Sequence, residues 1–152
     1  MNSPPPPSFG AQPVPVSMSA PSNLASPGLR VVGGLINVVI LAVLFGVVEA
    51  ITNRNHGGAG LVDLAVALGY FGYFWSSGGQ TVGMMVFGFR VRDRATGRFP
   101  SVGKAVLRGF VWWLEVWFTI CVIGLVGWLW MFWDSQRQGF HDKVAGTVVT
   151  KG

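Results

Sequence analysis

Charged side chains are scarce in this chain. Lysine, arginine, aspartate and glutamate make up 11% of its 152 residues, whereas about a quarter is typical of soluble proteins. Hydrophobic residues make up 51%. A soluble domain of this size could not bury so much apolar surface, because small domains have a large surface for their volume. The scarcity of charge therefore excludes an ordinary soluble fold and predicts an integral membrane protein.

Cysteine and histidine are also few. The single cysteine, Cys121, lies inside an apolar run, which excludes an intrachain disulfide and a paired-cysteine metal or redox motif. The two histidines, His56 and His141, stand at no metal-ligand spacing with each other or with cysteine. The sequence contains no nucleophile elbow, phosphate-binding loop, zinc-protease motif or paired carboxylates. We therefore expect no enzymatic activity, no catalytic residues, no cofactor and no metal site.

Acidic residues are outnumbered, with six against eleven basic ones, which gives a formal net charge of +5. Six of the cations lie in residues 78–108, where the only acid is Asp93. This segment lies between apolar runs, where anionic lipid headgroups attract each cation by about 1 kcal/mol. The basic charge therefore predicts anionic lipid as the partner of this loop, and no nucleic acid.

Proline is concentrated at the N-terminus. Eight of the nine prolines lie in residues 1–28, together with several serines and no charged side chain. This composition is typical of a disordered, partly polyproline II segment. The segment has neither the basic start nor the continuous apolar core of a secretory signal. We expect residues 1–28 to form a disordered tail and residues 29–152 to form the membrane domain.

Three apolar runs predict helical segments, at about residues 31–51, 59–77 and 109–133. The first run has 21 residues, enough for a helix to cross about 30 Å of hydrocarbon. A short turn separates the first two runs, so we expect an antiparallel helix hairpin. The third run carries six of the seven tryptophans, gathered towards both of its ends. It fits either a single span with an aromatic belt at each end, or a re-entrant pair of short helices that breaks near residues 124–127.

Residues 78–108 are predicted to form a basic cytoplasmic loop. Phe87, Phe89 and Val91 alternate with glycine and arginine, which predicts a short strand, and residues 147–150 form a second β-like run that could pair with it. Lysine and arginine concentrate on the cytoplasmic side of membrane proteins. A single third span puts seven cations on the side of the N-terminus and basic loop and four on the other, and a re-entrant run makes the division ten to one. Both place the N-terminus and the loop in the cytoplasm, and the steeper division favours a cytoplasmic C-terminus.

Polar side chains recur at matching depths in two of the runs. Asn37 lies seven residues after Arg30, and Glu115 lies seven residues after Arg108, which is about two turns along one helix face in each case. Polar groups inside a membrane are costly unless they have partners. In one interpretation each arginine extends to the headgroups while the polar residue bonds a neighbouring helix. In the other, Asn37, Arg108 and Glu115 form an intramembrane polar site on a path for an ion, a proton or a small ligand.

The polar segments carry a family resemblance. GQTVGMMVFGFRVRDRATGRFPSVGKAVLRG (residues 79–109) and FWDSQRQGFHDKVAGTVVTK (residues 132–151), with Arg30 at the head of the first helix, resemble the RDD family of small bacterial membrane proteins. The family is named for one arginine and two aspartates. The resemblance implies that Arg30 is the family arginine and Asp142 the second aspartate. Asn37 stands where the first aspartate is expected.

The resemblance implies an all-α, multi-pass protein of the bacterial inner membrane that transports an unidentified ligand. Asn37 keeps the hydrogen-bonding shape of aspartate but has neither its charge nor its proton exchange. Either Glu115 therefore supplies the ionisable group, or this chain has kept the fold as a packing module. Two functions follow. The first is aid in moving a small solute or ion, and the alternative is a non-catalytic membrane subunit or scaffold that forms a homo-oligomer or joins a larger complex.

Overall fold

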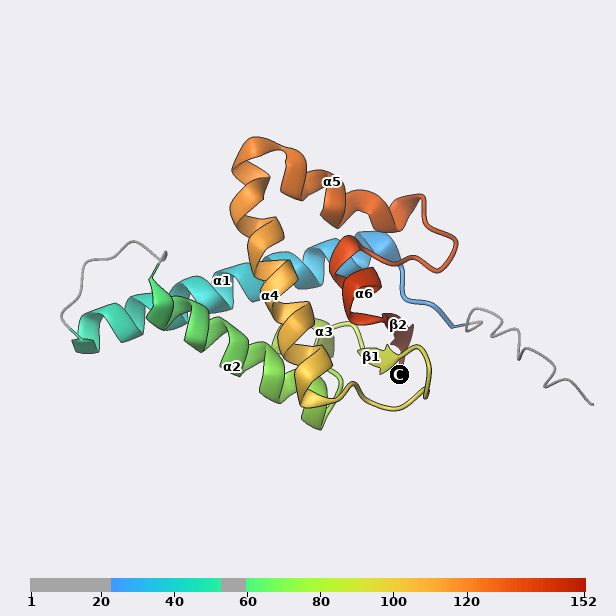
Figure 1. The fold of residues 1–152 in the computed structure, drawn as a ribbon, viewed down its shortest axis with the longest axis horizontal. Coiled ribbons are helices and arrows are strands. Elements are labelled where there is room, and N and C mark those ends of the chain that lie inside the picture. The colour runs from blue at the N-terminus through green and yellow to red at the C-terminus, as the bar shows by residue number, and fades with distance from the viewer. Residues whose placement is uncertain (1–22, 53–59) are drawn as a thin grey trace, which may run out of the picture.

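Helices dominate the computed structural model, which describes residues 23–52 and 60–152 (Figure 1). The mostly helical fold predicted from the sequence is confirmed, and the predicted β-like strands form one small antiparallel sheet. In chain order the elements are α1 (Pro27–Thr52), α2 (Leu61–Ser77), α3 (Val82–Met85), β1 (Phe89–Asp93), α4 (Val102–Phe118), α5 (Ile123–Leu129), α6 (Phe140–Ala145) and β2 (Thr147–Lys151). Two 3₁₀ turns, Thr119–Cys121 and Trp130–Phe132, flank α5.

The longest helix, α1, is well suited to a membrane. Its 26 residues extend for about 39 Å at about 1.5 Å per residue, more than the roughly 30 Å of a hydrocarbon layer. Among the described helices, α1 alone is both long and apolar enough to cross a membrane. Its side chains Leu35, Val39 and Val43 are 53%, 63% and 61% exposed, as lipid-facing residues would be. The other two predicted segments are shorter as helices, because α2 and α4 have 17 residues each.

The core lies mainly where α2 packs along α4. Phe71 is fully buried, stacks on Trp75 at 4.5 Å between ring centroids, and meets the edge of Trp112 at 4.8 Å. Gly109 permits this approach, since a Cβ added there would lie 2.8 Å from the Cβ of Phe71. The tight packing brings Trp75 of α2 against the buried face of α4, on which the polar site is built.

The third apolar run, residues 109–133, does not form one helix. Its first part belongs to α4, the chain turns at residues 119–122, and α5 then packs back against α4 (Figure 1). Val122 has a left-handed backbone with φ of 66°, a conformation that glycine favours and a β-branched residue rarely adopts. Gly124 allows the sharp corner, because a Cβ there would collide with the backbone of α4. The run therefore doubles back, and its break comes before residues 124–127.

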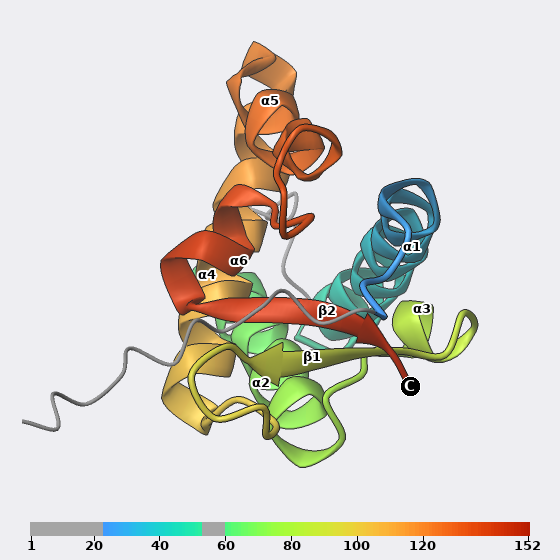
Figure 2. The ribbon, with the colours of Figure 1, turned by 90° about the vertical axis from the view of Figure 1, so that its right-hand side faces the viewer.

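The segment predicted as a basic loop, residues 78–108, is ordered. It contains α3, β1 and the first two turns of α4. β1 pairs antiparallel with β2, Val91 lying opposite Val149 at the centre of the ladder, so the predicted strand pairing is confirmed. Figure 2 shows this small sheet beside α6, with α3 leading into β1. The sheet therefore ties the basic segment to the C-terminal part of the chain.

The end of the predicted tail is also part of the fold. Residues 1–22 lie outside the described residues, but Leu24 bridges to Thr150, and the backbone N–H of Ala25 donates to the carbonyl of Val149 at 3.0 Å. Helix α1 then begins at Pro27, where a proline suits the first turn. The last residues of the predicted tail are therefore held by β2, and the disorder expected for the rest of the tail stays a prediction.

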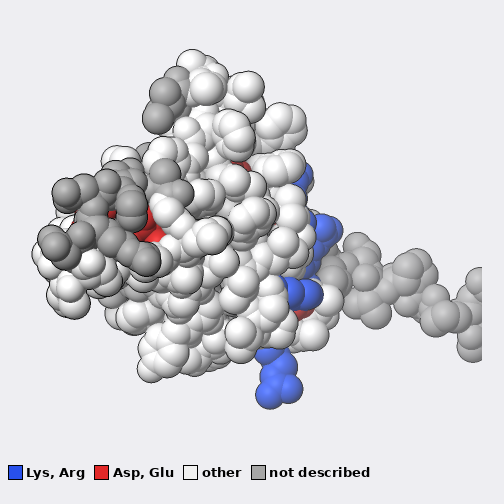
Figure 3. All heavy atoms as spheres, turned by 60° about the vertical axis from the view of Figure 1, so that its left-hand side comes forward, with Lys and Arg blue, Asp and Glu red and all other residues white. Residues whose placement is uncertain are grey.

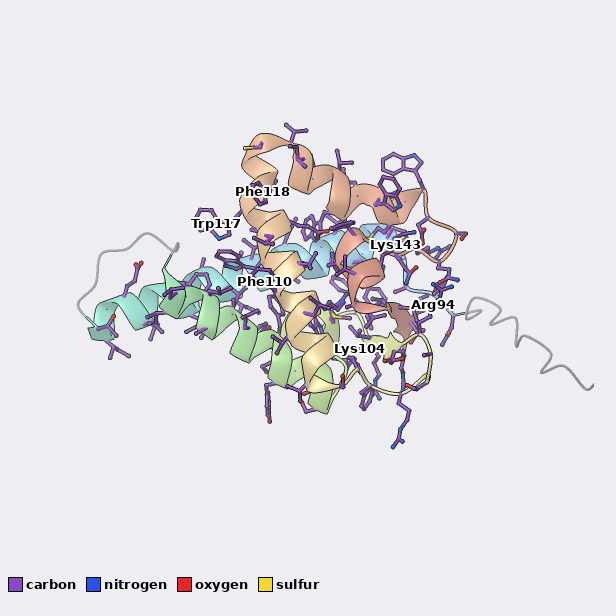
Figure 4. All side chains as sticks on the ribbon, viewed as in Figure 1. Arg94, Lys104, Phe110, Trp117, Phe118 and Lys143 are labelled. Carbon is purple, nitrogen blue, oxygen red and sulfur yellow. The ribbon has the colours of Figure 1, made fainter. Side chains whose placement is uncertain are left out.

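Charge is distributed unevenly over the surface. Figure 3 shows lysine and arginine side chains at one end of the molecule, while the rest of that face is largely uncharged. In Figure 4, Arg94, Lys104 and Lys143 lie at this end, and Trp117 and Phe118 lie at the far end of α4. A basic end and an apolar body are what a protein presents when its body lies in lipid.

Candidate functional site

Asp142 is the centre of a buried ion cluster. It lies on α6, is fully buried, and accepts a hydrogen bond from the backbone N–H of Gly139 at 3.0 Å. Arg30 of α1 forms an ion pair with its Oδ2. Arg108 of α4 donates to its Oδ1 from Nε at 3.0 Å and from Nη2 at 2.6 Å. One carboxylate therefore joins three helices that are far apart in the sequence.

The two arginines fix the charge of this carboxylate. Burial alone would raise the pKa of Asp142, but the positive charges of Arg30 and Arg108 outweigh burial and hold the pKa well below its usual range. Asp142 is consequently an anion under all ordinary conditions. The cluster of these three residues carries one net positive charge inside the protein.

Arg108 retains unused hydrogen-bonding capacity. Its side chain is 4% exposed, and the guanidinium carbon lies 4.0 Å above the Trp75 ring, a cation–π contact. Nε and Nη2 are both taken by Asp142, whereas the buried Nη1 has no hydrogen-bond partner. An unpartnered charged donor in the interior is costly.

Glu115 is engaged by His141. The Nδ1 atom of His141 lies 2.6 Å from Oε2 of Glu115, and the backbone N–H of His141 donates to Oε1 at 3.2 Å. The other ring nitrogen, Nε2, lies 3.6 Å from Oδ2 of Asp142. His141 is not among the residues predicted for the site, because it stands at no metal-ligand spacing with another histidine or cysteine. The signal that could have found it is its neighbour Asp142 in the motif RQG-x-HDK.

Asn37 binds neutral groups. It is 4% exposed on α1, and its Oδ1 accepts from the Tyr70 hydroxyl at 3.0 Å and from the backbone N–H of Gly83 at 3.2 Å. Its Nδ2 donates to Thr81 Oγ1 at 2.9 Å. Close packing of α1 on α3 makes this geometry possible, since a Cβ added to Gly83 would collide with the carbonyl of Gly33. Asn37 therefore joins α1, α2 and the start of α3.

A small cavity links these groups. Its volume is about 40 Å³, and its polar lining consists of Arg30, Asn37, Arg108 and His141. Aromatic rings and other apolar side chains form the remaining walls. Two members of the predicted polar site, Asn37 and Arg108, thus meet at one cavity, and Glu115 adjoins it through His141. Within residues 23–52 and 60–152, no three histidine, cysteine or acidic side chains are arranged to hold a metal ion.

Comparison with known proteins identifies the family. The model described as the RDD family matches residues 24–146. The chain belongs to the RDD family. It is therefore a membrane protein, and α1 is the part of the described structure best suited to the bilayer.

Relatives of this RDD protein have no established activity in their names. The "Proline-rich antigen" of Mycobacterium leprae is 33% identical over 90 residues, 59% of this chain and 34% of that protein. An "Uncharacterized protein" of Haemophilus influenzae is 30% identical over 135 residues, 86% of this chain and 81% of that protein. The chain covers only about a third of the mycobacterial relative's length. No solved structure matches the chain.

The three RDD signature positions, Arg30, Asn37 and Asp142, lie at or next to the cavity. Arg30 and Asp142 are joined directly as an ion pair, and Arg30 also lines the cavity. Asn37, at the position that the resemblance gives to the first aspartate, lines the cavity without bringing a charge. Glu115 of α4 does not line the cavity, but it is bonded to His141, which does.

Two further ion pairs brace the basic end. Lys104 of α4 lies 2.5 Å from Asp93 of β1, and its hydrogen bond lowers the pKa of Asp93. Lys143 of α6 lies 2.5 Å from Asp134. Burial raises the pKa of Asp134, but Lys143 and backbone N–H donors lower it by more than burial raises it, so the pKa lies below its usual range. Both lysines are more than a third exposed, so each pair stabilises the fold only slightly.

Proposed function

We propose that this RDD protein moves a small solute or ion across the bacterial inner membrane. The observation that carries the proposal is the cavity between α1, α2, α4 and α6, with Arg30, Asn37, Arg108 and His141 in its lining. Charged groups inside a membrane protein are costly and typically mark the path of an ion or substrate. A fold that needed only stability would be served as well by apolar residues at these positions.

In this proposal the protein is multi-pass, and its N-terminus and basic end face the cytoplasm. Arg94 precedes the doubled-back third run and Lys143 follows it, yet both lie at the same end of the molecule (Figure 4). The positive-inside rule then puts ten of the eleven cations with the N-terminus. Anionic headgroups are the natural partners of this end. The cavity lies near the cytoplasmic end of α1, since Arg30 is in its first turn.

Reconstitution of the full chain into liposomes tests transport. Vesicles loaded with potassium chloride are diluted into isosmotic sucrose that contains a protonophore, so that proton movement compensates the charge of the ion that leaves, and ion-selective electrodes follow both ions. We expect faster release of one ion than from protein-free vesicles, and release at the protein-free rate for Arg108→Gln and Glu115→Gln. Asp134→Asn removes a carboxylate away from the cavity and should transport like the wild type. Equal release from wild-type and protein-free vesicles, repeated with sodium and nitrate salts, would overturn the proposal.

A second function is supported by the outer surface of α1. Leu35, Val39 and Val43 are exposed along this helix, and a Cβ added to Gly46 would meet nothing within 4 Å. Such a surface suits packing against another membrane helix, either from a second copy or from a larger complex, and this role needs no catalysis. Purification in mild detergent distinguishes the two functions. A stable oligomer or a stoichiometric partner supports the subunit role, and a monomer alone counts against it.

A further inference from the structure

A groove larger than the polar cavity runs between α4 and α5. Its volume is about 440 Å³, and Glu115 is the only charged residue among the ten that line it. The Glu115 side chain is only 6% exposed, and both of its carboxylate oxygens are bonded to His141. The rest of the lining is apolar, so an occupant of this groove meets aliphatic side chains and aromatic rings.

The groove follows the α4–α5 hairpin from its tip to its base. Phe118 and Ile123, which are 53% and 73% exposed, line it where the chain turns. Trp130 and Phe140 line it towards the other end of α5. The apolar stretch Ile123–Phe132 extends for about 15 Å at about 1.5 Å per residue, which is half of the roughly 30 Å hydrocarbon layer. In the proposed topology the groove therefore has the depth of the cytoplasmic leaflet.

The size of the groove favours an acyl chain over a helix. A cavity of about 150 Å³ holds one benzene molecule, so a groove of about 440 Å³ has room for roughly three times as many carbons. Spread over the roughly 10 Å from Ile123 to Trp130, this volume leaves a width of about 6–7 Å, whereas a helix with its side chains is about 10 Å wide. An extended hydrocarbon chain fits this width, and a helix of a second copy does not.

The base of the groove lies beside two exposed cations. The carbonyl of Trp130 accepts from the backbone N–H of Asp134 at 3.2 Å, and Lys143 follows Phe140 by three residues on the same face of α6. Lys143 is 42% exposed and pairs with Asp134 at 2.5 Å. Arg137 is exposed in the same loop, where its backbone N–H donates to the carbonyl of Asp134 at 2.9 Å. Asp134, Arg137 and Lys143 together carry a net charge of +1, which complements an anion at this end of the groove.

We propose that an anionic phospholipid of the cytoplasmic leaflet binds to this hairpin, with one acyl chain in the groove and its phosphate at Lys143. The ammonium of Lys143 has three donors, so the phosphate can share it with Asp134. Trp130 lies where the acyl chain meets the headgroup, a level at which tryptophan is enriched. This headgroup position is on α6, outside the basic segment 78–108 for which the sequence predicted lipid contact. The inference needs the hairpin in the bilayer, as in the proposed topology, and does not depend on transport.

Native mass spectrometry of the full chain in detergent tests the site. The protein is titrated with phosphatidylglycerol, which is anionic, or with phosphatidylcholine, which is zwitterionic, both carrying the same acyl chains. We expect the first phosphatidylglycerol to bind about fivefold more tightly than the first phosphatidylcholine, the usual contribution of one lysine near a membrane surface. Wild-type protein that binds the two lipids equally overturns the inference.

Two variants with matched controls test the position of the lipid. Val126 lines the groove and is 53% exposed, so Val126→Trp fills the groove without burdening the core. It should weaken the first phosphatidylglycerol about threefold or more, because packing contacts hold an acyl chain in hydrocarbon. Val39→Trp makes the same change on the exposed face of α1 and should have no effect. Lys143→Gln should remove the preference for phosphatidylglycerol, whereas Arg94→Gln, at the same end of the molecule, should keep it (Figure 4).

The remaining outcomes separate this inference from its alternatives. Unchanged lipid binding in Val126→Trp, or an unchanged preference in Lys143→Gln, overturns the assigned position. A dimer without a preferred lipid, lost in Val126→Trp, overturns it in favour of an interface between two copies. Preferred lipid binding with ion release at the protein-free rate overturns transport alone, and ion release without a preferred lipid overturns the lipid site alone.

Discussion

Replacement of Asp142 by asparagine tests the ion cluster most directly. The change is nearly isosteric, but it removes the only negative charge to which both Arg30 and Arg108 are bonded. The Asp142 side chain is fully buried, and the two arginine side chains are 7% and 4% exposed. Breaking a buried ion pair by removing one partner costs about 3–5 kcal/mol. Because two cations lose their partner here, we expect a loss of unfolding free energy at the upper end of that range.

This loss can be measured by unfolding the protein in mixed micelles with an increasing fraction of a denaturing detergent. Near-ultraviolet circular dichroism of the tryptophans monitors the unfolding. Asp134→Asn is the matched control, since its partner Lys143 is 42% exposed and such a pair is worth less than about 1 kcal/mol. A double variant, Asp142→Asn with Arg30→Gln, should recover part of the loss because it removes one of the unpaired charges. If Asp142→Asn unfolds within about 1 kcal/mol of the wild type, the cluster does not hold the helices together.

Three other predictions concern single contacts. The bond from Lys104 lowers the pKa of Asp93, so it stabilises the fold by about 1 kcal/mol or less above the unfolded carboxyl pKa of about 4. This contribution is lost as the pH falls through the lower, folded pKa. Asp93→Asn should therefore reduce the dependence of the unfolding free energy on pH in that range, as measured by acid unfolding. Gly83→Ala should destabilise by about 1–3 kcal/mol, because its Cβ meets the α1 backbone, whereas Gly69→Ala, with nothing within 4 Å, should raise the thermal midpoint slightly. Asn37→Leu should destabilise the fold by about 1–3 kcal/mol, because the Tyr70 hydroxyl and the backbone N–H of Gly83 lose their acceptor. An unchanged thermal midpoint would contradict these hydrogen bonds.

The sequence predicted the local elements of the site better than their partners. Spacing of seven residues correctly placed Arg108 and Glu115 on one face of a helix. Spacing within one helix cannot identify what that face meets, and the partners Asp142 and His141 come from α6, far along the chain. The ion pair of Arg30 with Asp142 joins two positions that the family resemblance had already singled out, although neither periodicity nor charge count links them.

The break in the third run could not be located from composition. Residues 119–122 are as apolar as their surroundings, and Val122, whose left-handed backbone makes the turn, is a poor turn former. The break was predicted near Gly124 and Gly127 because glycine is common in turns. In the structure these glycines instead let α5 lie close to α4. Tertiary contact between two apolar helices, rather than a turn motif, determines where the chain reverses.

The place of Asp142 in the chain has a consequence for biosynthesis. Arg30 and Arg108 both emerge from the ribosome before the carboxylate that neutralises them, since α6 follows α1 and α4. Until α6 is made, each arginine is most stable at the headgroups and not between helices. In the proposed multi-pass topology, α1 and α4 would enter the bilayer before α6 is made, and α6 would then draw the two cations into the buried cluster. A nascent chain stalled before α6 would remain loosely packed and recognisable to membrane proteases.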